Sequence, residues 1–242
     1  MESKNINKSI KFIGTAIAEL ITLITIVKVI SSGEWERILL AFGTLFLVLV
    51  PALMEKLFHC KVSLPLYIFG LFYAIGPMFG HCWKFYYTIS WWDKMLHAFG
   101  GVAFALIGAF LFERMAQGKQ KPYVVALFAL IFSIAVAAVW EFMEFGADRF
   151  FGMDMQDDMV IHQITSYLLG DQVGVTGMID GIESVIVNGT ALPVAGYIDI
   201  GLFDSMLDML LESLGAILTA AIVWLDKGRH SLIRSDSKEK IV

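Results

Sequence analysis

Seven side chains that could hold a metal ion or move a proton recur at helical spacing in three separated stretches of this sequence. They are Asp93, His97, Glu141, Glu144, Asp204, Asp208 and Glu212. Neighbours within each stretch are three or four residues apart, so they project from one face of a helix. Several such pairs meeting inside a helical bundle are typical of carboxylate-rich sites.

Carboxylates grouped with one imidazole are donors that magnesium, manganese, calcium or zinc take in proteins. We therefore expect a divalent cation, and the predicted ligands are a subset of Asp93, His97, Glu141, Asp204 and Asp208. Glu144 or Glu212 is predicted to be the general base or a residue that orients a ligand. A cation held in this way would polarise a phosphate or ester and lower the pKa of its bound water.

Helix capping is the simpler explanation for two of these residues. Asp93 and Asp204 open their helices, where an acidic side chain caps the free amides. Capping does not explain Asp208 and Glu212, which lie one and two turns further along. Nearby cations are few, so either some carboxyl groups are protonated or a bound cation neutralises them.

The composition is that of a membrane protein. Of 242 residues, 57% are hydrophobic and 17% are charged, and the mean hydropathy is +0.71. A soluble chain of this size could not bury so much apolar surface, and a disordered chain would be far more polar. The net charge of −5 argues against a nucleic-acid partner.

Apolar runs near 20 residues predict an all-α polytopic bundle with six transmembrane helices, forming one domain over residues 1–242. The expected spans are Phe12–Ile30, Ile38–Leu57, Val62–Phe79, Asp93–Phe112, Tyr123–Phe145 and Phe203–Leu225. With the N-terminus inside, thirteen lysines and arginines fall in cytoplasmic segments and five in outer ones. This bias predicts cytoplasmic termini, with residues 226–242 as a basic cytoplasmic tail.

Residues 146–202 form an acidic outer loop between the fifth and sixth spans. Met159–Leu169 could form an amphipathic helix. Ile182–Ile198 resembles a hairpin with Asn188-Gly189 as its turn. A loop this long is either a functional cap over an outer vestibule or a solvated insertion, and the sequence favours neither.

Two smaller features complete the picture. Cys60 and Cys82 flank one predicted span, which places them too far apart for a disulfide, so we expect free thiols. Glu19 lies within the first span, where it could pair across the bundle, serve a proton path or reach the membrane surface.

Three ordered strings resemble a known family. The segments Trp92–His97, Trp140–Glu144 and Asp204–Asp208, with Gly215-Ala216, are similar to the YjdF-like bacterial membrane proteins and, more distantly, to the VanZ-like proteins. The resemblance implies a helical protein of the bacterial inner membrane with a shared polar site, and it implies no defined reaction. Glu212 departs from the VanZ-like pattern, which tends to have asparagine at this position.

Three functions are consistent with these features. The leading hypothesis is a metal-dependent hydrolase or transferase acting on a lipid or lipid-linked envelope substrate. The second is a cation- or proton-coupled transporter, and polar residues in the inner half of the spans are too few to favour it. The third is a non-catalytic protein that binds an envelope lipid or a partner through the outer loop. Assembly into a homo-oligomer is left open.

Overall fold

The computed structural model describes residues 2–116, 120–226 and 233–235, and the described chain is mostly helical. Six of its helices are long and apolar enough to cross a membrane, which confirms the predicted six-span bundle. They are α1 (Glu2–Ile30), α2 (Trp35–Leu57), α3 (Leu64–Cys82), α5 (Trp92–Met115), α6 (Pro122–Phe151) and α7 (Leu202–Leu225). The protein is therefore a multi-pass membrane protein.

Helix α6 is longer than its apolar run. It was expected to end at Phe145 and instead continues to Phe151, one residue before Gly152 adopts a positive φ of 64°. A left-handed glycine is a common helix end. As a result Glu141, Glu144 and Asp148 all lie within the helix.

The burial pattern of α7 places polar and small side chains inward. Its buried stripe carries the three acidic residues in its first half and small residues in its second half. Leucine, isoleucine and phenylalanine side chains occupy the exposed faces, as lipid contact requires. The acidic residues of α7 thus share the stripe that packs inside the protein.

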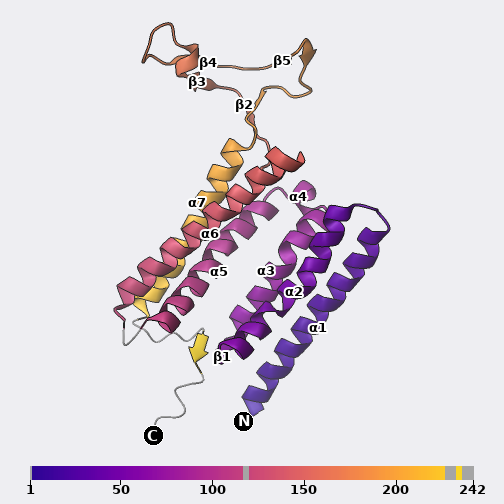
Figure 1. Ribbon diagram of the computed structural model, residues 1–242, viewed down its shortest axis with the longest axis vertical. Coiled ribbons are helices and arrows are strands. Elements are labelled where there is room, and N and C mark those ends of the chain that lie inside the picture. Colours follow the sequence, from indigo (N-terminus) through magenta and orange to yellow (C-terminus); the bar gives the residue numbers. More distant parts are fainter. Residues whose placement is uncertain (1, 117–119, 227–232, 236–242) are drawn as a thin grey trace. The chain divides into compact units, whose positions relative to one another are not determined.

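The chain divides into two compact units. One comprises Met1–Val136 with Leu211–Val242, and the other comprises Ala137–Leu210. In the first unit α1, α2 and α3 lie side by side (Figure 1). The short helix α4 (Phe85–Thr88) precedes α5, and the Trp92 indole donates to the Gly76 carbonyl at 3.2 Å, which fixes the start of α5 against α3.

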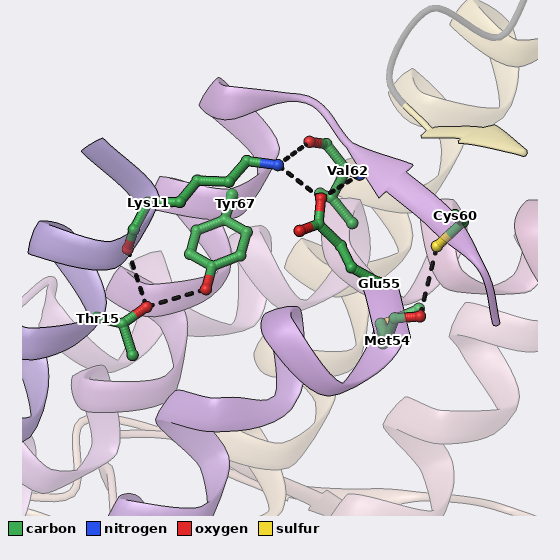
Figure 2. A network of polar contacts seen from close by, with 7 residues as sticks. All are labelled: Lys11, Thr15, Met54, Glu55, Cys60, Val62 and Tyr67. Carbon is green, nitrogen blue, oxygen red and sulfur yellow. Dashed lines mark hydrogen bonds and ion pairs between the residues drawn. The ribbon is translucent and has the colours of Figure 1, made fainter. Parts of the chain in front are cut away.

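A brace of polar contacts joins α1 and α2 to the segment that follows α2 (Figure 2). Lys11 Nζ donates to Glu55 Oε1 at 2.6 Å and to the Val62 carbonyl. The same Glu55 oxygen accepts the Val62 amide at 2.8 Å. Thr15 and Tyr67 hydroxyls meet at 2.9 Å beside this group. The brace holds the connection between α2 and α3 in one conformation.

That connection forms strand β1 (Cys60–Val62), which pairs antiparallel with β8 (Ile233–Ser235). The predicted basic tail thus includes one short strand, while residues 227–232 and 236–242 lie outside the described part of the chain. Cys60 in β1 and Cys82 at the end of α3 are both buried and form no disulfide with each other, as expected.

The second unit contains the long loop between α6 and α7, which consists of short strands rather than a helix. They are β2 (Val160–Ile161), β3 (Ile164–Ser166), β4 (Gly177–Ile179), β5 (Ile186–Val187), β6 (Thr190–Ala191) and β7 (Tyr197–Ile198), with a 3-10 turn at Tyr167–Leu169. Pairing joins β2 to β7, β3 to β4 and β5 to β6. In Figure 1 the β3–β4 and β5–β6 arms extend in opposite directions from β2.

The expected amphipathic helix over Met159–Leu169 is wrong. Four of its first seven residues are β-branched, and such side chains favour extended backbone. The Asp199 carboxylate also accepts the Met159 amide at 2.7 Å, outside any helix. The predicted hairpin turn is confirmed, since Asn188 and Gly189 join β5 to β6 with φ of 51° and 83°. The hairpin is shorter than the expected Ile182–Ile198, because Tyr197–Ile198 pairs with β2.

Candidate functional site

The first turns of α5 place Lys94 and His97 beside the Asp93 carboxylate. Lys94 Nζ lies 3.0 Å from Asp93 Oδ2, and His97 Nε2 lies 3.6 Å from Asp93 Oδ1. Trp91 holds the cap position of α5 and makes no side-chain capping bond. Asp93 is therefore inside the helix and turned toward His97, so the capping explanation does not describe it.

Glu212 of α7 lies on the other side of the imidazole. Its Oε2 is 3.8 Å from His97 Nδ1, so His97 has a carboxylate beside each ring nitrogen. Both separations exceed a hydrogen bond. Only 5% of the Glu212 side chain is exposed, and among the described residues its Oε1 has no hydrogen-bond partner. A buried carboxylate oxygen without a donor is costly unless a proton or a cation satisfies it.

Glycines allow α5 and α7 to come close enough for this arrangement. A Cβ on Gly101 would lie 1.9 Å from the Glu212 carbonyl oxygen, and one on Gly215 would lie 2.2 Å from the Ala98 carbonyl oxygen. These backbones touch directly, as small residues permit between membrane helices. Gly101 and Gly215 therefore position Glu212 against α5.

Tyr73 of α3 joins the same region, and sequence reasoning missed it. Its hydroxyl and the Glu212 carboxylate face the same point above Gly100, at 2.9 Å and 3.7 Å from where a Cβ would stand. A lone tyrosine within an apolar span carries no spacing signal, so only packing reveals it.

Asp208 completes the group of donors that could hold a metal ion. It lies one turn before Glu212 on the continuous helix α7, and its exposed fraction is 1%. One side-chain donor atom each from Asp93, His97 and Asp208 lie within 4.8 Å of one another. Two donors about 2.1 Å from one ion are at most about 4.2 Å apart, so binding would require a contraction of up to about 0.6 Å.

The remaining predicted ligands, Glu141 and Asp204, are buried but outside this three-residue group. Glu144 is also buried and accepts the Trp140 indole N–H at 2.8 Å. The structure thus brings Asp93, His97 and Asp208 together with Glu212 nearby. Glu144 accepts a hydrogen bond from Trp140 of its own helix.

Two other carboxylates organise the two ends of the long loop between α6 and α7. Asp148 accepts the Met155 and Gln156 amides at 2.6 Å and 2.9 Å, which shapes the turn after α6. Asp199 accepts the amides of Met159 and Phe203, both at 2.7 Å, and so joins the loop to the start of α7. An aspartate shortly before a predicted helix is the signal that could have identified this role.

The loop acids also repel one another. Burial and the neighbouring Asp148 and Asp204 raise the pKa of Asp154 above its ordinary 3.8. Burial, followed by Asp154, Asp199 and Asp148, raises the pKa of Asp158 in the same direction. The base of the loop is therefore a region of concentrated negative charge.

Comparison with known proteins places the chain in one family. No curated protein and no solved structure shows a significant match to it. A family model described as "Predicted membrane protein (DUF2238)" matches residues 13–229, which is most of the chain. The chain therefore belongs to this family of predicted membrane proteins.

Proposed function

We propose that this protein binds a divalent cation through Asp93, His97 and Asp208 and uses it to hydrolyse or transfer a lipid or lipid-linked envelope substrate. The observation that carries the proposal is the Asp93/His97/Asp208 group, in which His97 and Asp208 are buried, with the buried Glu212 carboxylate beside the imidazole. Three protein ligands that leave a further position for water are typical of catalytic metal sites.

The proposed chemistry assigns a proton acceptor to the site. A bound cation would polarise a phosphate or ester and lower the pKa of a water beside it. Glu212 Oε1 is buried and has no hydrogen-bond partner among the described residues, so Glu212 would accept the proton of the attacking water and return it to the leaving oxygen. Magnesium, manganese, calcium and zinc all suit a donor set of carboxylates and one imidazole.

We keep supporting roles for the other predicted residues. Glu141 and Asp204 would supply negative charge around the cation, and Glu144 is the alternative proton acceptor. The bias of lysine and arginine supports cytoplasmic termini, which would place the site at the outer side of the membrane. The resemblance to the YjdF-like and VanZ-like proteins supports a location in the bacterial inner membrane.

The test is the metal content of protein purified in detergent, measured by elemental mass spectrometry for wild type, Asp208→Asn and His97→Ala. Asp171→Asn is the matched control, because Asp171 is an exposed loop residue. We expect near-stoichiometric metal in wild type and control, and its loss in both site variants. A wild type that holds no metal after incubation with each of the four cations would overturn the proposal.

A second function has its own supporting observation. The outer loop exposes large apolar side chains to water, including Tyr167, Leu168 and Val173, with 95% of Leu168 exposed. Exposed apolar side chains outside a membrane span are typical of binding surfaces. Binding of a partner by this loop would be compatible with catalysis or would replace it. Pull-down from membranes with wild type and a Leu168→Ser/Val173→Ser variant separates partner binding from metal binding, because the variant would lose the partner and keep the metal.

If no metal binds, transport becomes the favoured function. Glu19 of α1 has a buried carboxylate oxygen without a hydrogen-bond partner among the described residues. A protonatable carboxyl group in a span is a common feature of proton paths. Flux into proteoliposomes that falls in Glu19→Gln would then support the transporter hypothesis.

A further inference from the structure

The Lys94 ammonium group lies at the edge of the candidate metal site, next to Asp93, which is one of the three residues of that site. Asp93 turns one oxygen toward Lys94, at 3.0 Å, and its other oxygen toward His97, at 3.6 Å. An ammonium group in this position is next to the space where a substrate would approach the proposed cation. The proposed metal chemistry does not use it.

Exposure of the side chains shows from which side this group can be reached. The exposed fraction is 24% for Lys94 and Asp93, 10% for His97 and 5% for Glu212. Lys94 and Asp93 therefore lie at the accessible edge, and Glu212 is the most deeply buried of the four. A ligand that approaches from outside would meet Lys94 and Asp93 before it reached His97 and Glu212.

Local electrostatics make this edge favourable for an anion. Lys94 lies in the first turn of α5, which begins at Trp92, and the positive end of a helix dipole attracts negative charge. An anionic group bound by Lys94 would gain from the ammonium, from the helix end and from the adjacent cation.

We propose that the substrate of this site carries a phosphate group and that Lys94 binds one of its oxygens. This inference rests on the proposed function, because it uses the same Asp93, His97 and Asp208 cation site. A phosphate group offers several anionic oxygens, so one can bind the metal while another accepts a proton from Lys94. A neutral ester offers no charge to match the ammonium group.

A structural role for Lys94 makes a different prediction. If the ammonium group only neutralises Asp93, its removal would leave phosphate binding unchanged and would strengthen cation binding, because a competing positive charge is gone. The two roles can therefore be separated by measuring metal and phosphate binding on the same variants.

The experiment uses metal-loaded full-length protein in an uncharged detergent and isothermal titration calorimetry. The probes are dioctanoyl phosphatidic acid, inorganic phosphate and dioctanoylglycerol, and metal content is measured on each sample. The variants are Lys94→Met and Lys94→Arg, with Lys84→Met as the control, since Lys84 is an exposed lysine shortly before α5. Tighter binding of the lipid than of inorganic phosphate would identify a lipid headgroup as the source of the phosphate, and equal binding would identify free phosphate.

We expect Lys94→Met to keep its metal and to bind the phosphate probe about ten-fold or more weakly, because a charge-assisted hydrogen bond is lost. Lys94→Arg should retain most of the affinity, and Lys84→Met should match wild type. Unchanged phosphate binding by Lys94→Met, or equal binding of dioctanoylglycerol by wild type, would overturn this inference and leave the metal site standing. A wild type without metal would instead refute the proposed function, and this inference with it.

Discussion

Replacing Gly101 by alanine tests whether the contact between α5 and α7 positions Glu212. The added Cβ would lie 1.9 Å from the Glu212 carbonyl oxygen and 2.9 Å from the Ala216 amide nitrogen. Both are backbone atoms, which cannot rotate away. Real Cβ atoms essentially never approach other atoms more closely than 3.0 Å, so the two helix backbones would have to separate locally by about 1.1 Å.

The cost follows from two opposing terms. Overpacking of a close contact destabilises a protein by about 1–3 kcal/mol, and a clash with backbone lies near the upper end. Alanine in place of glycine stabilises a helix by about 1 kcal/mol. We therefore expect a net loss of about 1–2 kcal/mol. The same displacement would move Glu212 from 3.8 Å to about 5 Å from His97, which should also weaken metal binding.

The assay is reversible unfolding in mixed micelles of dodecyl maltoside and dodecyl sulfate, followed by far-ultraviolet circular dichroism, with metal content measured in parallel. Gly43→Ala is the matched control, because Gly43 lies within α2 and its added Cβ meets nothing within 4 Å. The control should be neutral or slightly stabilised. Equal unfolding free energies and equal metal contents for the two variants would refute the positioning argument.

Two further predictions concern the brace and the loop. Glu55→Ala removes the acceptor of Lys11 and of the Val62 amide, so it should lower the unfolding free energy by about 1–3 kcal/mol in the same assay, whereas Glu34→Ala, which breaks a more exposed pair, should cost less. The raised pKa of Asp158 means that its contribution to stability is fully present below its ordinary pKa of 3.8 and is lost as pH rises through the raised value. Asp158→Asn should therefore slow amide hydrogen exchange in the loop at pH 7 but not at pH 4, and equal effects at both values would contradict this.

Local patterns were sufficient to predict much of the fold. The length of the apolar runs predicts six spans, since a helix needs about 20 residues to cross the hydrocarbon core. Asn188-Gly189 predicts its hairpin because both residues tolerate positive φ. Spacing by three and four residues predicts that Asp208 and Glu212 share one face of α7, and both are buried on that face. Each of these features depends on neighbours along the chain.

Predictions from local sequence patterns were wrong where contacts with other residues determine the structure. Spacing of apolar residues suggested a helix after Met159, but Asp199, forty residues away, binds the Met159 amide and stabilises extended backbone. Asp93 resembled a cap in the sequence, whereas its carboxylate is turned toward Lys94 and His97. A carboxylate can pair with several kinds of side chain, and helix packing determines which of these side chains lie close to it.

The sequence by itself therefore determined the membrane class, the number of spans and the set of polar residues from which a site could be built. Tertiary structure decided which of these residues meet. The direct contact of α5 and α7 at Gly101 and Gly215 sets Glu212 against His97, and the packing of α3 against α5 brings Tyr73 to the same place. The physical reason is that periodicity defines which face a residue occupies on its helix. The rotation and separation of packed helices depend on the shapes of all the side chains between them.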